Sequence, residues 1–121
     1  MPQVYITSIT MSRNTPELQQ LRQEFNQLKH RLAKTGFICT GSLMSLYRRC
    51  GKPYCACQKD EKSLHGPYTV WTRKVQAKTV TRTLHAKQAD LCKRSIQNMR
   101  EVEAIIERMK ELSAIYIESQ R

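Results

Sequence analysis

The middle of the chain reads Cys50-Gly51-Lys52-Pro53-Tyr54-Cys55-Ala56-Cys57, and after seven more residues it continues as His65-Gly66-Pro67-Tyr68. Three thiols and one imidazole therefore lie within sixteen residues, separated by segments that favour tight turns. Three cysteines and a histidine form one of the ligand sets of a closed structural zinc site. We expect Cys50, Cys55, Cys57 and His65 to bind one zinc ion that fixes the shape of this segment.

The spacing differs from a standard pair of C-x-x-C knuckles, so alternatives to this ligand set stay open. Either Cys39 or Cys92 could replace His65 as the fourth ligand if the fold brought it close. Otherwise both are expected to be small core residues. In a further alternative the three clustered thiols bind no metal and only accompany a structural turn.

No catalytic pattern accompanies the cluster. The sequence has no H-E-x-x-H or H-x-E motif, no recognisable nucleophile arrangement and no glycine-rich phosphate loop. Asp60 and Glu61 are the carboxylates nearest to the cysteines, and they sit in a charged loop. We predict no catalytic residues and expect that the chain is not an enzyme.

The net charge is +11, from 21 Lys and Arg against 10 Asp and Glu in 121 residues. Residues 42–90 hold ten of the basic residues and three of the acidic ones, so the excess is concentrated around the cysteines. A localised basic surface favours a polyanion, most often nucleic acid. The candidate nucleic-acid contacts are Arg48, Arg49, Lys52, Tyr54, Arg73, Lys74, Lys78 and Arg82.

Residues 37–85 are expected to form a small β module around the cluster. Residues 68–75 and 78–84 are rich in β-branched side chains and predict two strands of a basic hairpin. The turn between them, Gln76-Ala77, lacks the Gly or Asn that tight hairpin turns prefer. Residues 41–47 fit either a strand or a short helical turn. Trp71 is expected in the core rather than on nucleic acid.

Two helices are expected to flank this module, over residues 15–36 and 86–121, after an N-terminal tail of residues 1–14. The tail contains a possible short strand at residues 4–7. Thr15 is a suitable N-cap and Pro16 fits the first helical position. Apolar residues recur at spacings of three and four in both helices, as in a heptad repeat. The predicted dimerisation residues are Leu18, Leu21, Phe25, Leu28, Leu32, Val102, Ile105, Met109, Leu112 and Tyr116.

The fold class that these elements predict is α+β. Two long helices would form an antiparallel hairpin or coiled coil, with a small zinc-stabilised β module at one end. The apolar faces of the helices can be buried on each other, on a second copy of the chain, or on both. We expect a homodimer.

The sequence also predicts where the protein resides. Its N-terminus lacks the basic and apolar regions of a secretory signal, and no apolar stretch is long enough to cross a bilayer. We therefore expect a cytoplasmic protein with no membrane partner. Clustered cysteines in such a reducing compartment more often bind metal than form disulfides.

The central motif resembles a family of short prokaryotic proteins that is classed as a domain of unknown function. Its hallmark is C-G-K-P-x-C-x-C followed by H-G-P-Y, a basic "GKT" hairpin and a helical tail, and the resemblance covers residues 41–112. The resemblance implies that the three cysteines and the histidine act together. It also implies a small accessory protein carried on mobile elements beside recombinases or transposases. One departure is Gln76-Ala77-Lys78, which lacks the glycine often found in the hairpin.

Two functions follow from these observations. The first is a nucleic-acid-binding accessory or regulatory protein of a mobile element, its recombinase or its transposase, with double-stranded DNA as the expected ligand. The second is a coiled-coil interaction protein that binds a partner protein without touching nucleic acid.

Overall fold

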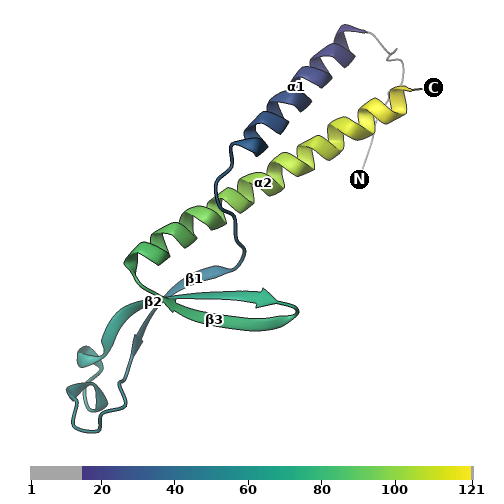
Figure 1. Cartoon of the computed structure of the whole chain (residues 1–121). Coiled ribbons are helices and arrows are strands. Elements are labelled where there is room, and N and C mark those ends of the chain that lie inside the picture. The colour runs from purple at the N-terminus through teal and green to yellow at the C-terminus, as the bar shows by residue number, and fades with distance from the viewer. Residues whose placement is uncertain (1–14, 121) are drawn as a thin grey trace. The chain divides into compact units, whose positions relative to one another are not determined.

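The computed structural model describes residues 15–120 and divides the chain into two compact units (Figure 1). The helical unit holds residues 15–36 and 100–120 of this range, and the sheet unit holds residues 37–99. The tail, with its possible strand at residues 4–7, lies outside the described residues. The elements are α1 (Pro16–Ala33), β1 (Ser42–Arg48), β2 (His65–Val75), β3 (Lys78–Leu84) and α2 (Ala86–Ser119), with 3-10 turns η2 (Ala56–Gln58) and η3 (Glu61–Ser63) between β1 and β2.

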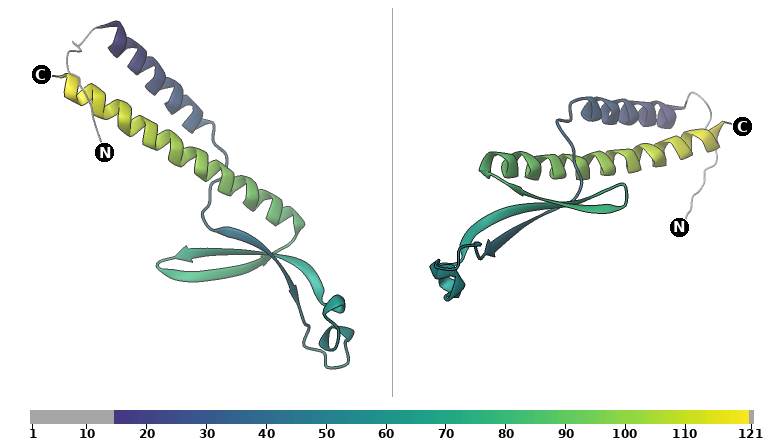
Figure 2. Two further views of the ribbon diagram at one scale, coloured as in Figure 1. Left: turned by 180° about the vertical axis from the view of Figure 1, so that it is seen from behind. Right: turned by 60° about the horizontal axis from the view of Figure 1, so that its bottom comes forward.

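The predicted α+β class is correct, but the predicted architecture is wrong. The strands form a three-stranded antiparallel sheet in the order β1-β2-β3, which is the main part of a compact unit of its own and not a small module (Figure 2). The reason is that the first half of α2 belongs to the sheet unit. The N–H of Cys39 donates to the carbonyl of Ser95 at 3.3 Å, and Asn98 Nδ2 donates to the carbonyl of Phe37 at 2.9 Å.

The start of α1 follows the signals in its sequence. Thr15 has an extended backbone, and its hydroxyl accepts a hydrogen bond from the N–H of Leu18 at 3.3 Å. Pro16 occupies the first helical position, where its missing N–H costs nothing. Glu17 in the first turn and Arg31 in the last both complement the helix dipole.

In the helical unit α1 packs antiparallel to the second half of α2. Two ion pairs between the helices agree with this direction, Arg108 with Glu24 at 2.6 Å and Arg31 with Glu101 at 3.7 Å. The Arg108 guanidinium lowers the pKa of the Glu24 carboxyl through this hydrogen bond. The buried core is Leu18, Leu21, Leu28, Ile105 and Leu112, with Phe25, Leu32, Met109 and Tyr116 packed against it.

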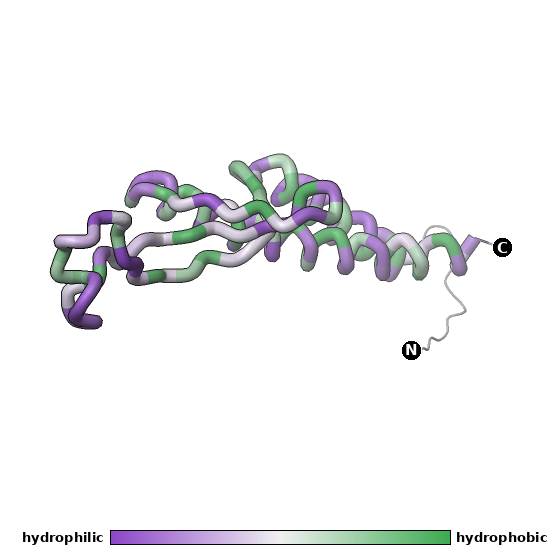
Figure 3. Tube along the Cα trace, turned by 90° about the horizontal axis from the view of Figure 1, so that it is seen from below, coloured by the Kyte–Doolittle hydropathy of each residue, from purple (hydrophilic) through white to green (hydrophobic). Residues whose placement is uncertain are grey.

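Hydrophobic residues accordingly recur between hydrophilic ones along the helices (Figure 3). Nine of the ten predicted dimerisation residues thus form or line the core within one chain, and the tenth, Val102, is also buried. Homodimerisation stays a prediction, and a dimer would have to use other surface. Between residues 15 and 120, neither helix combines the length and the apolar character needed to cross a bilayer.

The segment at residues 41–47, for which the sequence allowed a strand or a short helical turn, enters strand β1 (Ser42–Arg48). β1 pairs with β2 from Ser42 opposite Thr72 to Arg48 opposite His65, with an irregularity between Leu46 and Arg48. Gly41, just before the strand, has a φ of 109°, and a Cβ there would collide with the carbonyl of Thr72. Glycine is therefore required where the chain enters the sheet.

The β2–β3 hairpin closes with a two-residue turn despite its unfavourable sequence. Val75 lies opposite Lys78, and the residues between them, Gln76 and Ala77, have φ values of 50° and 67°. Positive φ at both central positions is the geometry of a type I′ turn, which favours Asn and Gly. Non-glycine residues in this region carry a conformational cost of about 1–2 kcal/mol each.

Relieving this cost should stabilise the sheet unit. We expect Ala77→Gly to raise its free energy of unfolding by about 1 kcal/mol, since glycine adopts positive φ freely. Thermal unfolding followed by the fluorescence of Trp71, the only tryptophan of the chain, measures this. The matched control is Ala114→Gly on the exposed side of α2, which should destabilise the helical unit by about 1 kcal/mol because glycine disfavours helix, as followed by circular dichroism at the helix band. Equal destabilisation by both changes would contradict the turn geometry.

The packing of α1 against α2 predicts a second stability difference. Ile105 is 2% exposed, so Ile105→Ala should lower the stability of the helical unit by about 2–4 kcal/mol through lost burial and a cavity. Ile115 lies on the same helix and is 42% exposed, and Ile115→Ala should cost less than about 1 kcal/mol. Chemical unfolding followed by circular dichroism at the helix band compares the two variants. Similar losses would mean that the two helices do not pack as described.

Candidate metal centre and basic surface

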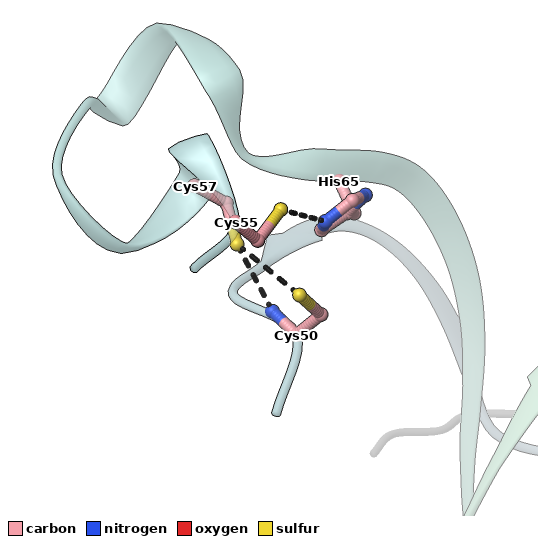
Figure 4. Close-up of side chains that lie close together, drawn as sticks. All are labelled: Cys50, Cys55, Cys57 and His65. Carbon is pink, nitrogen blue, oxygen red and sulfur yellow. Dashed lines mark hydrogen bonds between the residues drawn. The ribbon is translucent and has the colours of Figure 1, made fainter. Parts of the chain in front are cut away.

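The pairing of β1 with β2 brings the ends of the cysteine-rich segment together. β1 ends at Arg48, directly opposite His65, which begins β2. The segment between them leaves one strand and returns to its neighbour. Cys50 therefore lies beside His65, and η2 carries Cys57 back toward them (Figure 4).

The four predicted ligands lie close together in the structure. Their ligand atoms are all within 4.8 Å of one another. Cys50 Sγ lies 3.5 Å from Cys57 Sγ, and Cys55 Sγ lies 3.2 Å from His65 Nε2 (Figure 4). Cys57 is fully buried, while the other three ligands are half-buried.

These distances fit a tetrahedral metal ion. With zinc–sulfur bonds of about 2.3 Å, two thiolates of a tetrahedron lie about 3.8 Å apart. The chain thus offers three sulfurs and one nitrogen at this spacing, so the group can bind a metal ion. A full set of four protein ligands leaves no position open for substrate, as in structural sites.

Hydrogen bonds around the cluster hold the ligands in place. The N–H of Cys50 donates to Cys57 Sγ at 3.2 Å, and Arg49 Nη1 donates to the carbonyl of Cys57 at 2.6 Å. Gln58 Nε2 donates to the carbonyl of Cys50. Such outer contacts orient metal ligands. Sequence reasoning missed Gln58 because a single glutamine in a polar loop carries no signal of its own.

The electrostatics of the thiols differ within the cluster. The pKa of Cys55 is lowered to about 6, chiefly by a hydrogen bond from the N–H of Cys57 and then by His65. Burial raises the pKa of the Cys57 thiol. A metal ion would override both tendencies, because a coordinating thiol is deprotonated outright.

Two further features of the loop have structural explanations. Gly66 has a φ of 134°, and a Cβ there would approach the Leu46 carbonyl to 2.7 Å. The Asp60 carboxylate caps η3 by accepting from the N–H of Lys62 at 3.0 Å. The loop returning to His65 is thus shaped by a glycine and an Asx cap as well as by the cluster.

Cys39 and Cys92 are not part of this cluster. Their Sγ atoms lie 3.9 Å from each other, where the link after α1 meets the first half of α2. Burial raises the pKa of Cys92 to about 11. Of the two, Cys92 is buried and Cys39 half-buried, which agrees with small packing residues. The fourth member of the group that could bind a metal ion is His65.

The predicted nucleic-acid contacts fall into several settings. Arg49 donates a hydrogen bond to the carbonyl of Cys57, and the guanidinium of Arg48 lies 5.5 Å from the centre of the Tyr68 ring. Lys52 and Tyr54 are exposed in the cysteine loop, with Tyr54 82% exposed. The remaining four lie on the β2–β3 hairpin.

Strand pairing divides the cations of the hairpin between its two faces. Trp71 lies opposite Arg82, and Val75 lies opposite Lys78, so Arg73, Lys78 and Arg82 share one face. Lys74 is on the other face, where its Nζ donates to Thr79 at 2.7 Å.

The face that carries three cations also carries Trp71. The guanidinium of Arg73 lies 3.9 Å from the centre of the Trp71 ring, and Trp71 Nε1 donates to the carbonyl of Thr40 at 2.9 Å. Trp71 is half-buried and anchored, as expected for a packing residue. Lys78 and Arg82 are exposed.

Loss of one ligand should release the metal. We expect purified protein to retain a single zinc ion after dialysis, and Cys55→Ser to lose it and to lower the melting temperature of the sheet unit, because metal affinity of this kind is coupled to folding. The control is Cys39→Ser, which replaces a thiol outside the cluster and should keep the zinc. Metal content and Trp71 fluorescence melting measure both. Unchanged zinc content in Cys55→Ser would rule out the metal site.

The sequence matches the family described as Domain of unknown function (DUF6788) over residues 16–94. No curated protein matches the chain, and no solved structure does. The match covers α1, the whole sheet with its cysteine cluster, and the start of α2. Since it spans more than half of the sequence, the chain belongs to the DUF6788 family.

Proposed function

We propose that the protein is a DNA-binding accessory or regulatory protein whose sheet unit contacts the nucleic acid, with a structural zinc ion fixing its cysteine loop. The observation that supports this most directly is the uncompensated positive charge of the sheet unit. The resemblance noted in the sequence favours a role beside a recombinase or transposase of a mobile element.

The positive charge of the protein is unevenly distributed between the units. Residues 37–99 contain twelve Lys and Arg against three Asp and Glu, which is a net charge of +9 out of +11. The four ion pairs among the described residues all lie in the helical unit. Within residues 15–120, therefore, no cation of the sheet unit is paired with a carboxylate. Such a surface attracts phosphates and releases their counterions on binding.

The shape of the sheet unit suits a duplex. The β2–β3 hairpin is a two-stranded ribbon, and the DNA major groove admits such a ribbon. One face of this ribbon bears Lys78 and Arg82 with their side chains exposed. The cysteine loop adds Lys52 and the exposed ring of Tyr54, which can stack on a base or lie in a groove.

A zinc ion explains how this loop could hold one shape. Cys57 is the only buried residue between Arg49 and Leu64, so an apolar core cannot fix the segment. Zinc bound by Cys50, Cys55, Cys57 and His65 would order the loop and keep its cations in fixed positions. A pre-ordered loop loses less conformational entropy when it binds DNA.

Charge reversal on the hairpin tests this proposal. We expect Lys78→Glu with Arg82→Glu to weaken binding to a mixed-sequence DNA duplex by about tenfold or more and to reduce the slope of affinity against salt by about two phosphate contacts. Fluorescence anisotropy of the zinc-loaded protein, titrated at several salt concentrations, measures both quantities. Arg73 is left unchanged because its guanidinium packs on Trp71.

The matched control reverses two exposed cations of the helical unit, Lys34→Glu with Arg100→Glu. It changes net charge by the same amount and should leave most of the affinity intact. Equal losses in the two double variants would show that net charge, and not the hairpin, determines binding. Absence of binding by the unmodified protein at low salt would overturn the proposal.

A further inference from the structure

We propose that an apolar groove on the helical unit is a docking site for an acidic amphipathic helix of a partner protein. This site lies entirely within the helical unit and is separate from the proposed nucleic-acid surface.

The groove consists of two adjoining hollows between α1 and α2, with volumes of about 450 and about 390 Å³. Both hollows are lined by Phe25, Ser113 and Ile117, so they lie next to each other. The first extends toward Tyr116 and the second toward Ile106. From Ile106 to Ile117 the groove follows α2 for about 16 Å, at about 1.5 Å per residue.

The lining of this groove is apolar and partly open to solvent. Phe25 and Met109 are half-buried and pack on the core of the helical unit. Ile106 is 44% exposed and Ile117 is 68% exposed. Large exposed aliphatic side chains that line a hollow mark an interaction site more often than isolated ones do. The length of the groove corresponds to about three turns of a docked helix, which would insert side chains at i, i+3, i+4 and i+7.

The charged residues at the groove are basic, which favours an acidic partner. The charged residues that line it are Arg22, Lys29 and Lys110, and no carboxylate lines either hollow. Lys29 makes no ion pair or hydrogen bond within residues 15–120. Arg22 donates to the Tyr116 hydroxyl at 2.6 Å, which leaves its charge uncompensated, and only Lys110 has a carboxylate partner, Glu107 at 3.4 Å. A helix flanked by glutamate or aspartate would complement these cations.

The same charges argue against a second copy of this chain in the groove. Two identical grooves placed face to face around a twofold axis would bring the cations of one copy, Arg22, Lys29 and Lys110, toward the cations of the other. Like charges juxtaposed in an interface are unfavourable. The groove therefore favours a different protein with an acidic helix.

A direct test uses the full-length, zinc-loaded protein and a fluorescein-labelled helical peptide of about five turns. The peptide carries leucines at i, i+3, i+4 and i+7, flanked by glutamates, and a second peptide carries lysines in place of the glutamates. We expect the acidic peptide to bind with a dissociation constant of about 10 µM and the basic peptide about tenfold more weakly or not at all. No binding of the acidic peptide, or equal binding of both, would overturn the proposal.

Variants of α2 show whether the groove is the site. Ile117→Asp places a negative charge in the groove and should weaken acidic-peptide binding by about tenfold. Ile115→Asp is the matched control, because Ile115 is 42% exposed on the same helix and lines neither hollow. It should bind the peptide as the unmodified protein does. Circular dichroism verifies that both variants stay helical. Equal peptide affinities of the two variants would refute the assignment.

The basic sheet unit must also be excluded as the peptide site. The Lys78→Glu, Arg82→Glu variant should keep its affinity for the acidic peptide, and Ile117→Asp should keep its affinity for DNA. Loss of peptide binding in the hairpin variant alone would place the peptide on the sheet unit and overturn the proposal. A dimer that Ile117→Asp converts to a monomer would instead assign the groove to a second copy and would also overturn it. Neither result depends on whether the protein binds DNA.

Discussion

The antiparallel pairing of β1 with β2 is the constraint on which the sheet unit depends. It places Arg48 opposite His65, so the two ends of the cysteine-rich loop lie side by side. Only one residue of this loop is buried. Cys50 and His65 are fifteen positions apart in sequence, yet the strands hold their ligand atoms within 4.8 Å. Strand pairing thus closes the loop through backbone hydrogen bonds, and a metal ion would have only the loop between its ligands left to order.

Local signals in the sequence predicted the parts of the structure that depend on neighbouring residues. The helix start at Thr15 and the four clustered ligands rest on spacing and capping rules that act within a few residues. The strand at residues 42–48 stayed ambiguous, because so short a segment has no decisive period and owes its conformation to hydrogen bonds with β2. The β2–β3 turn formed without Gly or Asn because strand pairing outweighs the strain at Gln76 and Ala77.

The architecture was predicted wrongly because it depends on contacts between distant residues. The apolar spacing in α2 showed that the helix is long, but not that its first half would bond to residues 37–39 of the link. In the helical unit the spacing identified which faces of α1 and α2 are apolar. It did not predict that these faces would pack on each other within one chain. The ion pairs of Glu24 with Arg108 and of Arg31 with Glu101 join the two helices in this way. The spacing of apolar residues likewise could not predict the contact between Cys39 and Cys92.

The two units differ in how their charged side chains are balanced. This difference favours separate roles for the two units. In the helical unit most carboxylates are near arginines or lysines, so its net charge is small and its exposed apolar groove becomes the distinctive surface. In the sheet unit, cations outnumber carboxylates four to one, and repulsion among them lowers its stability. A small sheet can tolerate such repulsion if a metal ion holds its loop and if a polyanion neutralises the cations on binding. Charge concentrated on the unit with the smaller apolar core is therefore better explained by a ligand than by folding.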